Sequence, residues 1–336
     1  MIVLGIETSC DETAASVVGP DGVMSDVVHT QEVHVAYGGV VPELAGRAHA
    51  DKIVTTVQAA LQRAGVDKPD AVVATQGPGL IGAVLVGLCF GKAAAAGWGV
   101  PFVGVNHLEG HLLSATIEPS GPQFPFLSLV VSGGHTTLYL ARGVGDYEVL
   151  AETVDDAAGE AYDKVARMLG LGYPGGPKVD ALAQSGDSTA VNLPRPQPKA
   201  RPPRTPAGRH GIRPLDMSFS GLKTAVRGAL EADPSIKPED MAASFQAAVV
   251  DVLTNRITRA AKQTGVRRLA IAGGVAANSG LRAAVMELGL ECSLPPKNRC
   301  TDNAAMIAHA GRLRLLAGQR DSLGVAARAQ WTPGAS

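Results

Sequence analysis

Two histidines four residues apart, His107 and His111, are the residues of this sequence best suited to metal chemistry. They follow an apolar run, and in a helix residues i and i+4 share one face, so both imidazoles could bind one ion. Imidazole suits zinc, iron, copper or nickel, and a further ligand would have to come from elsewhere in the chain. By itself such a pair is more often two unrelated histidines than a metal site.

Glu109 gives this segment a partial likeness to the metalloprotease pattern His-Glu-x-x-His. The acid stands two residues after the first histidine, which would place it on the opposite face of a helix from the ion. The order of the residues therefore argues against a metalloprotease.

A third ligand is available near the C-terminus, in Cys300-Thr301-Asp302-Asn303, just before a predicted helix. Asp302 could simply cap that helix. It could also complete a site of two histidines and one carboxylate with His107 and His111. Both interpretations stay open from spacing alone.

Two turns could hold the other parts of a phosphate site. Ser132-Gly133-Gly134 would let backbone amides approach a phosphate without Cβ obstruction, or it could be an ordinary hairpin turn. The turn from Glu7 to Thr13 carries Glu7, Asp11 and Glu12. These acids would repel phosphate unless a cation stood between, and they could otherwise be a solvated acidic turn.

The strands and helices that must position these residues occur in two similar series along the chain. The first series predicts strands at 2–6, 14–18, 23–28, 70–75 and 101–105, and helices at 43–63, at 79–91 and around the histidine pair. The second predicts strands at 126–131, 137–141, 147–152 and 268–272, and helices at 154–169, after Asn278 and after Asp302. We therefore predict an α/β fold of two similar domains with a duplicated βββαβα plan, facing a central cleft. Their boundaries would be 1–120 and 121–336, with the last helix after residue 302 returning to the first domain.

Bulk composition sets the class of protein. A chain of 336 residues is long for one core, and 46% hydrophobic with 18% charged residues indicates an ordered globular protein. The four cysteines lack CxxC spacing, which is typical of a reducing compartment. The first residues do not resemble a signal peptide, and the longest apolar run, 79–91, is short for a membrane span and predicts a buried helix. We expect a soluble, cytoplasmic protein without a membrane partner.

One segment is strongly basic although the net charge of the chain is −1. Between Leu193 and Leu215 there are seven prolines and six lysines or arginines, with no acid. The segment could be a solvated linker. As the only concentrated positive patch in the sequence, it is our leading candidate for contact with nucleic acid.

Three further acids stand in the helix predicted at 154–169. Asp155 and Asp156 would lie in its first turn, where negative charge suits the helix dipole. Asp163 lies deeper, where capping does not explain it, and could bind a ribose hydroxyl or face solvent.

The motifs together resemble a known family. They are Glu7 to Thr13, Gly38 to Ala45, Thr75 to Leu80, Asn106 to His111, Val130 to Thr136, Tyr173 to Pro177, Phe219 to Thr224, Ala272 to Asn278 and Thr301 to Asn303. In this order they resemble the TsaD family of tRNA adenosine threonylcarbamoyltransferases, from residue 1 to about 331. That family is similar in fold to actin, sugar kinases and the ATPase domain of heat-shock chaperones.

The resemblance implies a reaction and a site. A threonylcarbamoyl group would move from threonylcarbamoyl-AMP to N6 of adenosine 37, in tRNAs reading codons that begin with A. An iron or zinc ion would be held by His107, His111 and Asp302. The nucleotide part of the donor would lie against Val130, Val131, Ser132, Gly133, Gly134, Asp163, Gly176, Asp180 and Asn278. Bacterial members work with TsaB and TsaE, while a separate synthase makes the donor. The basic loop after Leu193 is longer than the family leads us to expect, which leaves the RNA contact open.

The chemistry of the residues agrees with this reaction. The N6 amine is a poor nucleophile, so the donor carbonyl must be activated by its AMP leaving group, whose charge a metal ion can offset. The amides of Ser132 to Gly134 would hold the phosphate. Asp11 or Glu12 could orient the metal's water or take the amine proton.

Three other functions compete with this one. An ATP-dependent small-molecule kinase or ATPase of the same fold would leave the histidine pair without a role. A metalloprotease would need a different order of histidine and glutamate. A non-catalytic scaffold of a tRNA-modifying complex would not need His107 and His111 at all.

Overall fold

Each half of the chain builds a five-stranded sheet, and the two sheets have the same strand order. The first sheet runs β3 (Gly22–Thr30), β2 (Glu12–Gly19), β1 (Val3–Glu7), β4 (Ala71–Gly77), β5 (Phe102–Asn106). The second runs β8 (Asp146–Glu152), β7 (Thr136–Gly143), β6 (Phe126–Val131), β9 (Arg268–Ala272), β10 (Glu291–Ser293). In both, the first strand of the repeat pairs antiparallel with the next strand and parallel with the fourth. The predicted α/β fold with a duplicated plan is confirmed.

The computed structural model describes residues 1–200 and 211–334, and the chain divides into two compact units. The first unit comprises Met1–Gly121, Gly143–Tyr147 and Asp302–Ser336. The second comprises Pro122–Arg142 and Glu148–Thr301. Each unit has its own sheet and its own buried apolar residues.

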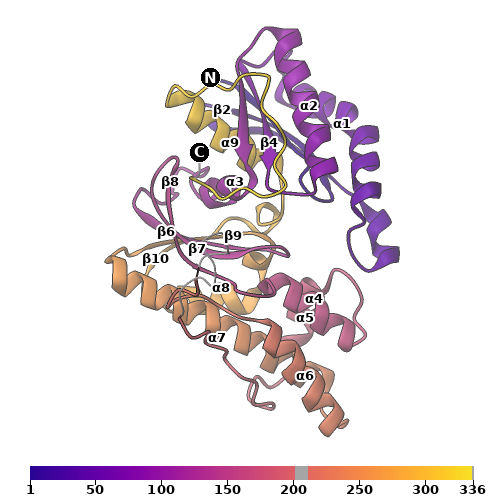
Figure 1. Cartoon of the computed structure of the whole chain (residues 1–336), viewed down its shortest axis with the longest axis vertical. Helices are drawn as coiled ribbons and strands as arrows, with labels where there is room; N and C mark the ends of the chain where they lie inside the picture. Colours follow the sequence, from indigo (N-terminus) through magenta and orange to yellow (C-terminus); the bar gives the residue numbers. More distant parts are fainter. Residues whose placement is uncertain (201–210, 335–336) are drawn as a thin grey trace. The chain divides into compact units, whose positions relative to one another are not determined.

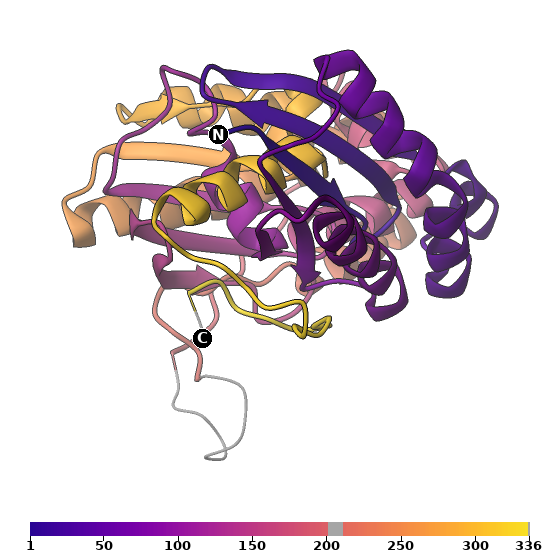
Figure 2. The ribbon, with the colours of Figure 1, turned by 90° about the horizontal axis from the view of Figure 1, so that it is seen from above.

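Helices cover both faces of the first sheet, which explains why β1, β4 and β5 are buried along their length (Figure 1). Side chains alternate between the faces of a strand. Leu4 and Ile6 therefore pack in the cluster formed with α1 (Pro42–Ala64) and α2 (Ile81–Trp98). Gly5, between them, faces α9 (Ala304–Leu316), where a Cβ would come within 2.6 Å of the Ala308 Cβ. Figure 2 shows α9, in yellow, lying along the indigo strands.

The apolar helix predicted at 79–91 is α2, and it is buried on one face only. Its buried residues include Ala83, Gly87 and Gly91, and Gly87 packs against the Thr8 hydroxyl. On the opposite face Ile81 is 52% and Leu85 is 49% exposed. By length and composition α2 could cross a membrane, with 33% of its residues buried. Its contacts with the first sheet instead indicate a helix that packs on a globular unit.

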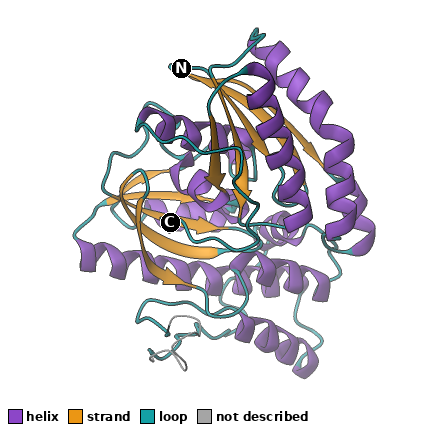
Figure 3. Cartoon of the chain, turned by 45° about the horizontal axis from the view of Figure 1, so that its top comes forward, coloured by secondary structure: helices purple, strands orange, loops and turns teal. Residues whose placement is uncertain are grey.

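The helices of the second unit pack with its sheet around one large apolar cluster (Figure 3). They are α4 (Ala158–Met168), α5 (Gly175–Ala183), α6 (Ser220–Ala232), α7 (Pro238–Thr264) and α8 (Ser279–Met286). Alternate residues of β6, Leu127, Leu129 and Val131, belong to this cluster. Short 3-10 helices lie at Glu32–Tyr37, Gly274–Ala277 and Lys297–Arg299.

The start of α4 corrects the prediction for two acids. The helix begins at Ala158 rather than Val154, so Asp155 and Asp156 lie ahead of it and do not occupy its first turn. Asp155 instead accepts hydrogen bonds from the backbone N–H groups of Phe219 and Ser220, at 2.8 and 3.2 Å. It therefore holds the N-terminus of α6, a contact across 64 residues of sequence that local patterning does not reveal.

Candidate metal centre and nucleotide site

The histidine pair lies on a short, buried helix, α3 (His107–Ser114), that follows β5 directly. Asn106 is its N-cap, and its side-chain oxygen accepts a hydrogen bond of 2.9 Å from the Leu108 N–H. The Asn106 amide also donates to the Trp331 carbonyl at 3.1 Å. The C-terminal segment thus helps to fix the point at which α3 begins.

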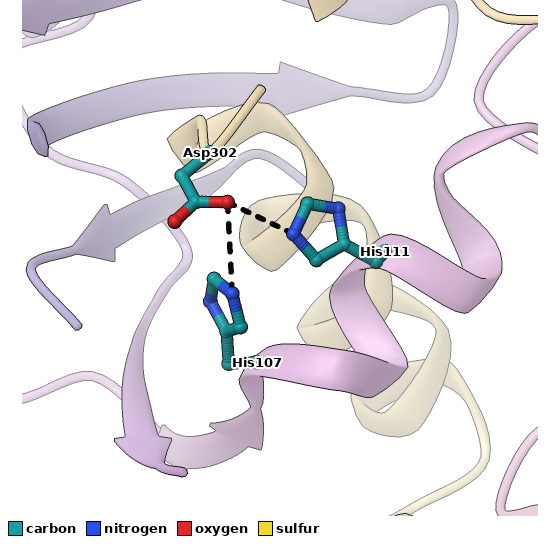
Figure 4. Close-up of side chains that lie close together, drawn as sticks. All are labelled: His107, His111 and Asp302. Atoms are coloured by element: carbon teal, nitrogen blue, oxygen red, sulfur yellow. Dashed lines mark hydrogen bonds and ion pairs between the residues drawn. The ribbon is translucent and has the colours of Figure 1, made fainter. Parts of the chain in front are cut away.

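His107, His111 and Asp302 converge within the first unit (Figure 4). Their potential ligand atoms all lie within 4.8 Å of one another. The Nε2 atoms of His111 and His107 are 2.9 and 3.6 Å from Asp302 Oδ1. Asp302 is not the helix cap, because Asn303 accepts the hydrogen bond from the Met306 N–H at 3.0 Å. Its carboxylate is therefore available to the histidines.

This donor set fits a divalent metal ion. Two imidazoles and one carboxylate are ligands that zinc and iron accept, and three protein ligands leave positions for water or substrate. Both histidines are buried, at 7% and 1% exposure, and nothing in a plain structural role requires two imidazole nitrogens to face one carboxylate oxygen.

The charges around the three residues depend on one another. Burial by itself would lower the pKa of His107, but the carboxylates of Asp302 and Glu7 outweigh burial and raise that pKa to about 9. Burial, Asp302 and Asp11 raise the pKa of Glu12 to about 10. So many carboxylates in one buried place favour a cation.

Cys10 lies among the same acids. Burial and the neighbouring carboxylates raise the pKa of its thiol, so it stays protonated and is a poor nucleophile. The acidic turn therefore offers oxygen atoms, and not a thiolate, to a reaction.

Glu109 turns away from the histidines, which excludes the metalloprotease pattern. Its carboxylate is fully buried, forms an ion pair with Arg314 Nε at 2.7 Å and accepts a 2.8 Å hydrogen bond from the Tyr147 hydroxyl. Arg314 lies on α9, so this ion pair joins α3 to the helix that follows Asp302.

The glycine turn after β6 lies in the second unit and presents open backbone. Gly133 and Gly134 are exposed, and the Ser132 hydroxyl accepts a hydrogen bond of 3.1 Å from the His135 N–H. Gly159 donates its N–H to the Ser132 carbonyl at 3.2 Å, and a Cβ on Gly159 would come within 2.6 Å of that oxygen. Gly159 therefore fixes the backbone of the turn at Ser132, while Gly133 and Gly134 remain exposed.

Val130 and Val131, which precede this turn, are buried at the end of β6. Gly273, at the end of β9, has φ of +92° and passes so close that a Cβ there would lie 2.3 Å from the Val131 carbonyl. Only glycine fits at that position. The predicted motif at 272–278 is thus built against the predicted phosphate turn.

The other predicted nucleotide residues cap helices of the same unit. Asp163 accepts a 2.7 Å hydrogen bond from the Gly175 N–H at the start of α5, so it does have the capping role that the sequence did not suggest. Gly176 follows in that first turn. Asp180 accepts from the Ser279 hydroxyl at 2.6 Å, and Asn278 is the N-cap of α8.

Two contacts in these sites carry no sequence signal. The side-chain Oε1 of Gln246 accepts a 2.6 Å hydrogen bond from the Asn278 side-chain amide, across 32 residues. The Thr75 hydroxyl donates to Glu7 at 2.7 Å, across 68 residues. Neither residue stands in a recognisable spacing with its partner, so only the folded chain reveals the pairs.

The predicted nucleic-acid segment lies partly outside the described residues, which omit 201–210 and with them Arg201, Arg204 and Arg209. Of its other basic residues, Arg195 pairs with Asp251 at 2.8 Å and Arg213 with Glu152 at 3.3 Å. Both pairs are exposed enough to be weak, so either arginine could exchange its partner for phosphate. A contact with RNA here stays a prediction.

Comparison with known proteins gives one consistent result. A family model described as "TsaD: tRNA N6-adenosine threonylcarbamoyltransferase" matches residues 22–309. A protein of that name from Trichlorobacter lovleyi is 50% identical over 98% of this chain and 96% of its own length. Another, from Anaeromyxobacter dehalogenans, is also 50% identical, over 95% of each chain.

Solved structures of distant proteins share the actin-like ATPase fold. HypF of T. kodakarensis superposes with a TM-score of 0.62 at 15% identity, over 94% of this chain and 48% of that chain. Component A of the (R)-2-hydroxyglutaryl-CoA dehydratase of Acidaminococcus fermentans gives 0.54 at 14% identity, over 93% and 99%. At such identities the likeness concerns the fold alone.

Proposed function

This chain belongs to the TsaD family of tRNA N6-adenosine threonylcarbamoyltransferases, and from that premise we propose how its residues carry out the reaction. It is a transferase that forms threonylcarbamoyladenosine in tRNA, as the sequence motifs led us to expect. The donor, the ion, the partners and the roles of individual residues are our proposals.

His107, His111 and Asp302 hold one divalent ion, Fe²⁺ or Zn²⁺. The observation that carries this part is the convergence of two buried imidazoles and one carboxylate within 4.8 Å. When bound, the ion offsets phosphate charge and polarises the donor as a Lewis acid. The carboxylate of Glu7, 2.8 Å from His107 Nδ1, keeps the surroundings negative, so the site prefers a doubly charged cation to an anion.

Threonylcarbamoyl-AMP is the donor, and its nucleotide lies against the glycine turn of the second unit. Val130 to Gly134 present backbone N–H groups to the phosphate, which supplies positioning as well as electrostatic stabilisation. Gly176 allows the nucleotide to approach the start of α5, and Asp163, Asp180 and Asn278 offer polar atoms to its ribose and base.

The acceptor is N6 of adenosine 37 in tRNAs that read codons beginning with A. Attack of N6 on the activated carbonyl forms the new C–N bond, breaks the bond from that carbon to the phosphate oxygen and releases AMP. The proton that the nitrogen loses goes to Asp11 or Glu12. Glu12 with a pKa near 10 would be protonated at neutral pH. A bound cation would lower the pKa of a nearby carboxyl group, which would make Glu12 available as a base.

The chain works in the cytoplasm with TsaB and TsaE-type proteins and without a membrane. The basic segment at 193–215 contributes to tRNA binding through phosphate contacts. Such contacts are sequence-independent and weaken with salt, which fits a role in holding the tRNA rather than choosing the base.

The test is transfer of radiolabelled threonine from threonylcarbamoyl-AMP to an unmodified tRNA transcript that reads A-starting codons, with the partner proteins present. Wild type is compared with Asp302→Ala and with a control, Asp51→Ala, whose carboxylate is exposed on α1. Loss of a ligand should lower the rate roughly 100-fold or more, as for removal of other electrostatic groups. The control should keep the wild-type rate.

The outcomes separate the alternatives. Label that survives Asp302→Ala would keep the reaction and remove Asp302 from the metal site. If wild type transfers no label while the donor remains intact, and also turns over ATP in the absence of tRNA, the result would favour a kinase or ATPase function.

A further inference from the structure

We propose that Glu7 is a positioning residue of the metal centre, which fixes the tautomer and the orientation of His107. This inference rests on the metal centre proposed above. It concerns a residue that does not itself belong to the three ligands, and it assigns a role to the buried acid at the end of β1.

The geometry around His107 gives its two ring nitrogens different tasks. Nδ1 lies 2.8 Å from Glu7 Oε2, whereas Nε2 faces Asp302 Oδ1 at 3.6 Å. A carboxylate can only accept a hydrogen bond, so Nδ1 must carry the proton. In the neutral ring, the form that binds a metal, the lone pair is then on Nε2, the nitrogen that points at the common ligand position. A carboxylate behind a metal-binding imidazole is a recurrent means of orienting the ring.

Glu7 can hold His107 because its own carboxylate is held. Thr75 on β4 donates its hydroxyl to Oε2 at 2.7 Å, and the Ser9 backbone N–H donates to Oε1. The residue is fully buried, and β1 is paired on both sides, with β2 and β4. Neither the backbone nor the side chain is free to turn, so the position of Nδ1 is fixed by the central strand of the sheet.

One neighbouring group competes for the same nitrogen. The Ser9 hydroxyl lies 3.1 Å from His107 Nδ1. A neutral hydroxyl is a weaker acceptor than a carboxylate and lies farther away, so Glu7 is the dominant partner. If Ser9 were the real partner, removal of the Glu7 charge would leave the imidazole in place.

The structure offers a matched control. Glu109 is also fully buried and lies two residues after His107 on the same helix, but it binds Arg314 and Tyr147 and not the imidazoles. Glu109→Gln removes a buried charge from the same helix without touching either histidine. It therefore reports general loosening of α3, whereas Glu7→Gln removes the negative charge that faces His107 Nδ1.

The experiment measures binding of Zn²⁺ to the purified full chain by competition with a chromophoric chelator, in the absence of tRNA. We expect Glu7→Gln to weaken Zn²⁺ binding 10- to 100-fold, in the range of other outer carboxylates, and Glu109→Gln to change it less than threefold. Equal affinity of wild type and Glu7→Gln, or equal weakening in both variants, would overturn the proposal.

A second measurement needs no substitution and remains decisive if Glu7→Gln does not fold. Imidazole ¹⁵N shifts of Zn²⁺-loaded wild type should show His107 with a protonated Nδ1 and a metal-bound Nε2. Zn²⁺ on Nδ1 would refute the assignment. If the wild-type chain binds no Zn²⁺, the proposed metal centre is itself wrong. The transfer assay with tRNA tests the proposed reaction separately.

Discussion

At the scale of single residues, acids that look alike in the sequence have different surroundings. Asp302 faces two imidazoles, Glu7 holds one of them from behind, and Glu109 pairs with an arginine on the other face of the helix. Glu7 and Glu109 are fully buried, and Asp302 is partly exposed. The identity of the atom opposite each carboxylate decides its role.

One buried histidine outside the site should make stability depend on pH. Burial and the nearby Arg312 lower the pKa of His309 to about 4, while the unfolded chain titrates near 6.5. Between pH 6.5 and pH 4 the imidazole is protonated in the unfolded state but neutral in the folded state, so the free energy of unfolding decreases as the pH falls through this range. At pH 5 the decrease is about 2 kcal/mol.

The variant His309→Gln removes this titration. Urea midpoints of wild type and variant, compared at pH 7.5 and pH 5.0, should show a smaller drop for the variant. An equal drop in both would mean that His309 does not remain neutral in the folded chain. Thr116, whose hydroxyl lies 2.8 Å from His309 Nε2, can still pair with the glutamine.

At the scale of elements, two of the proposed ligands come from α3 and the third from the residues just before α9, so these two helices must keep a fixed separation. Gly110 of α3 lies so close to α9 that a Cβ there would come within 2.7 Å of Ile307 Cδ1. The Glu109–Arg314 ion pair joins the same two helices. Burial raises the pKa of Glu109 more than Arg314 lowers it, so the carboxyl group depends on its partner to stay charged.

Breaking this ion pair should be costly, whereas replacing both partners should not. Arg314→Met leaves Glu109 buried without a counter-ion and should destabilise the first unit by about 3–5 kcal/mol. The double variant Glu109→Gln with Arg314→Met should recover most of that loss, because the amide needs no counter-ion and can still accept from Tyr147. Thermal unfolding of the wild type and the two variants tests this, and a double variant as unstable as Arg314→Met would refute the argument.

At the scale of the whole molecule, the two chemical sites belong to different units. His107, His111 and Asp302 fall in the first unit, and the residues proposed for the nucleotide fall in the second. A ligand stabilises the part of the chain that binds it, by about 2.7 kcal/mol when its free concentration is 100 times its dissociation constant. Zn²⁺ and AMP should therefore act on different parts of the chain.

Hydrogen–deuterium exchange can detect this division. Zn²⁺ should slow exchange in α3 and α9, and AMP should slow exchange around residues 132–134 and at the starts of α5 and α8. Asp302→Ala should abolish the Zn²⁺ effect and preserve the AMP effect. Protection of the second unit by Zn²⁺ alone would contradict the assignment of the metal centre.

The sequence by itself determined the family, the strand plan and most of the candidate residues. Alternating strands, the i,i+4 histidines and the glycine turns are local patterns, and each is visible within a few residues because backbone geometry dictates its period. The position of Glu109 away from the ion followed from the same geometry. These features needed no knowledge of long-range contacts.

Only the tertiary structure decided which distant groups meet. Asp302 could have been a cap until Asn303 was seen to take that role, and Asp163, expected to have no cap, holds the start of α5. The Glu7–His107 contact joins residues 100 apart in sequence. Such pairs form because strands and helices bring them together when they bury apolar surface, and no local spacing encodes that meeting.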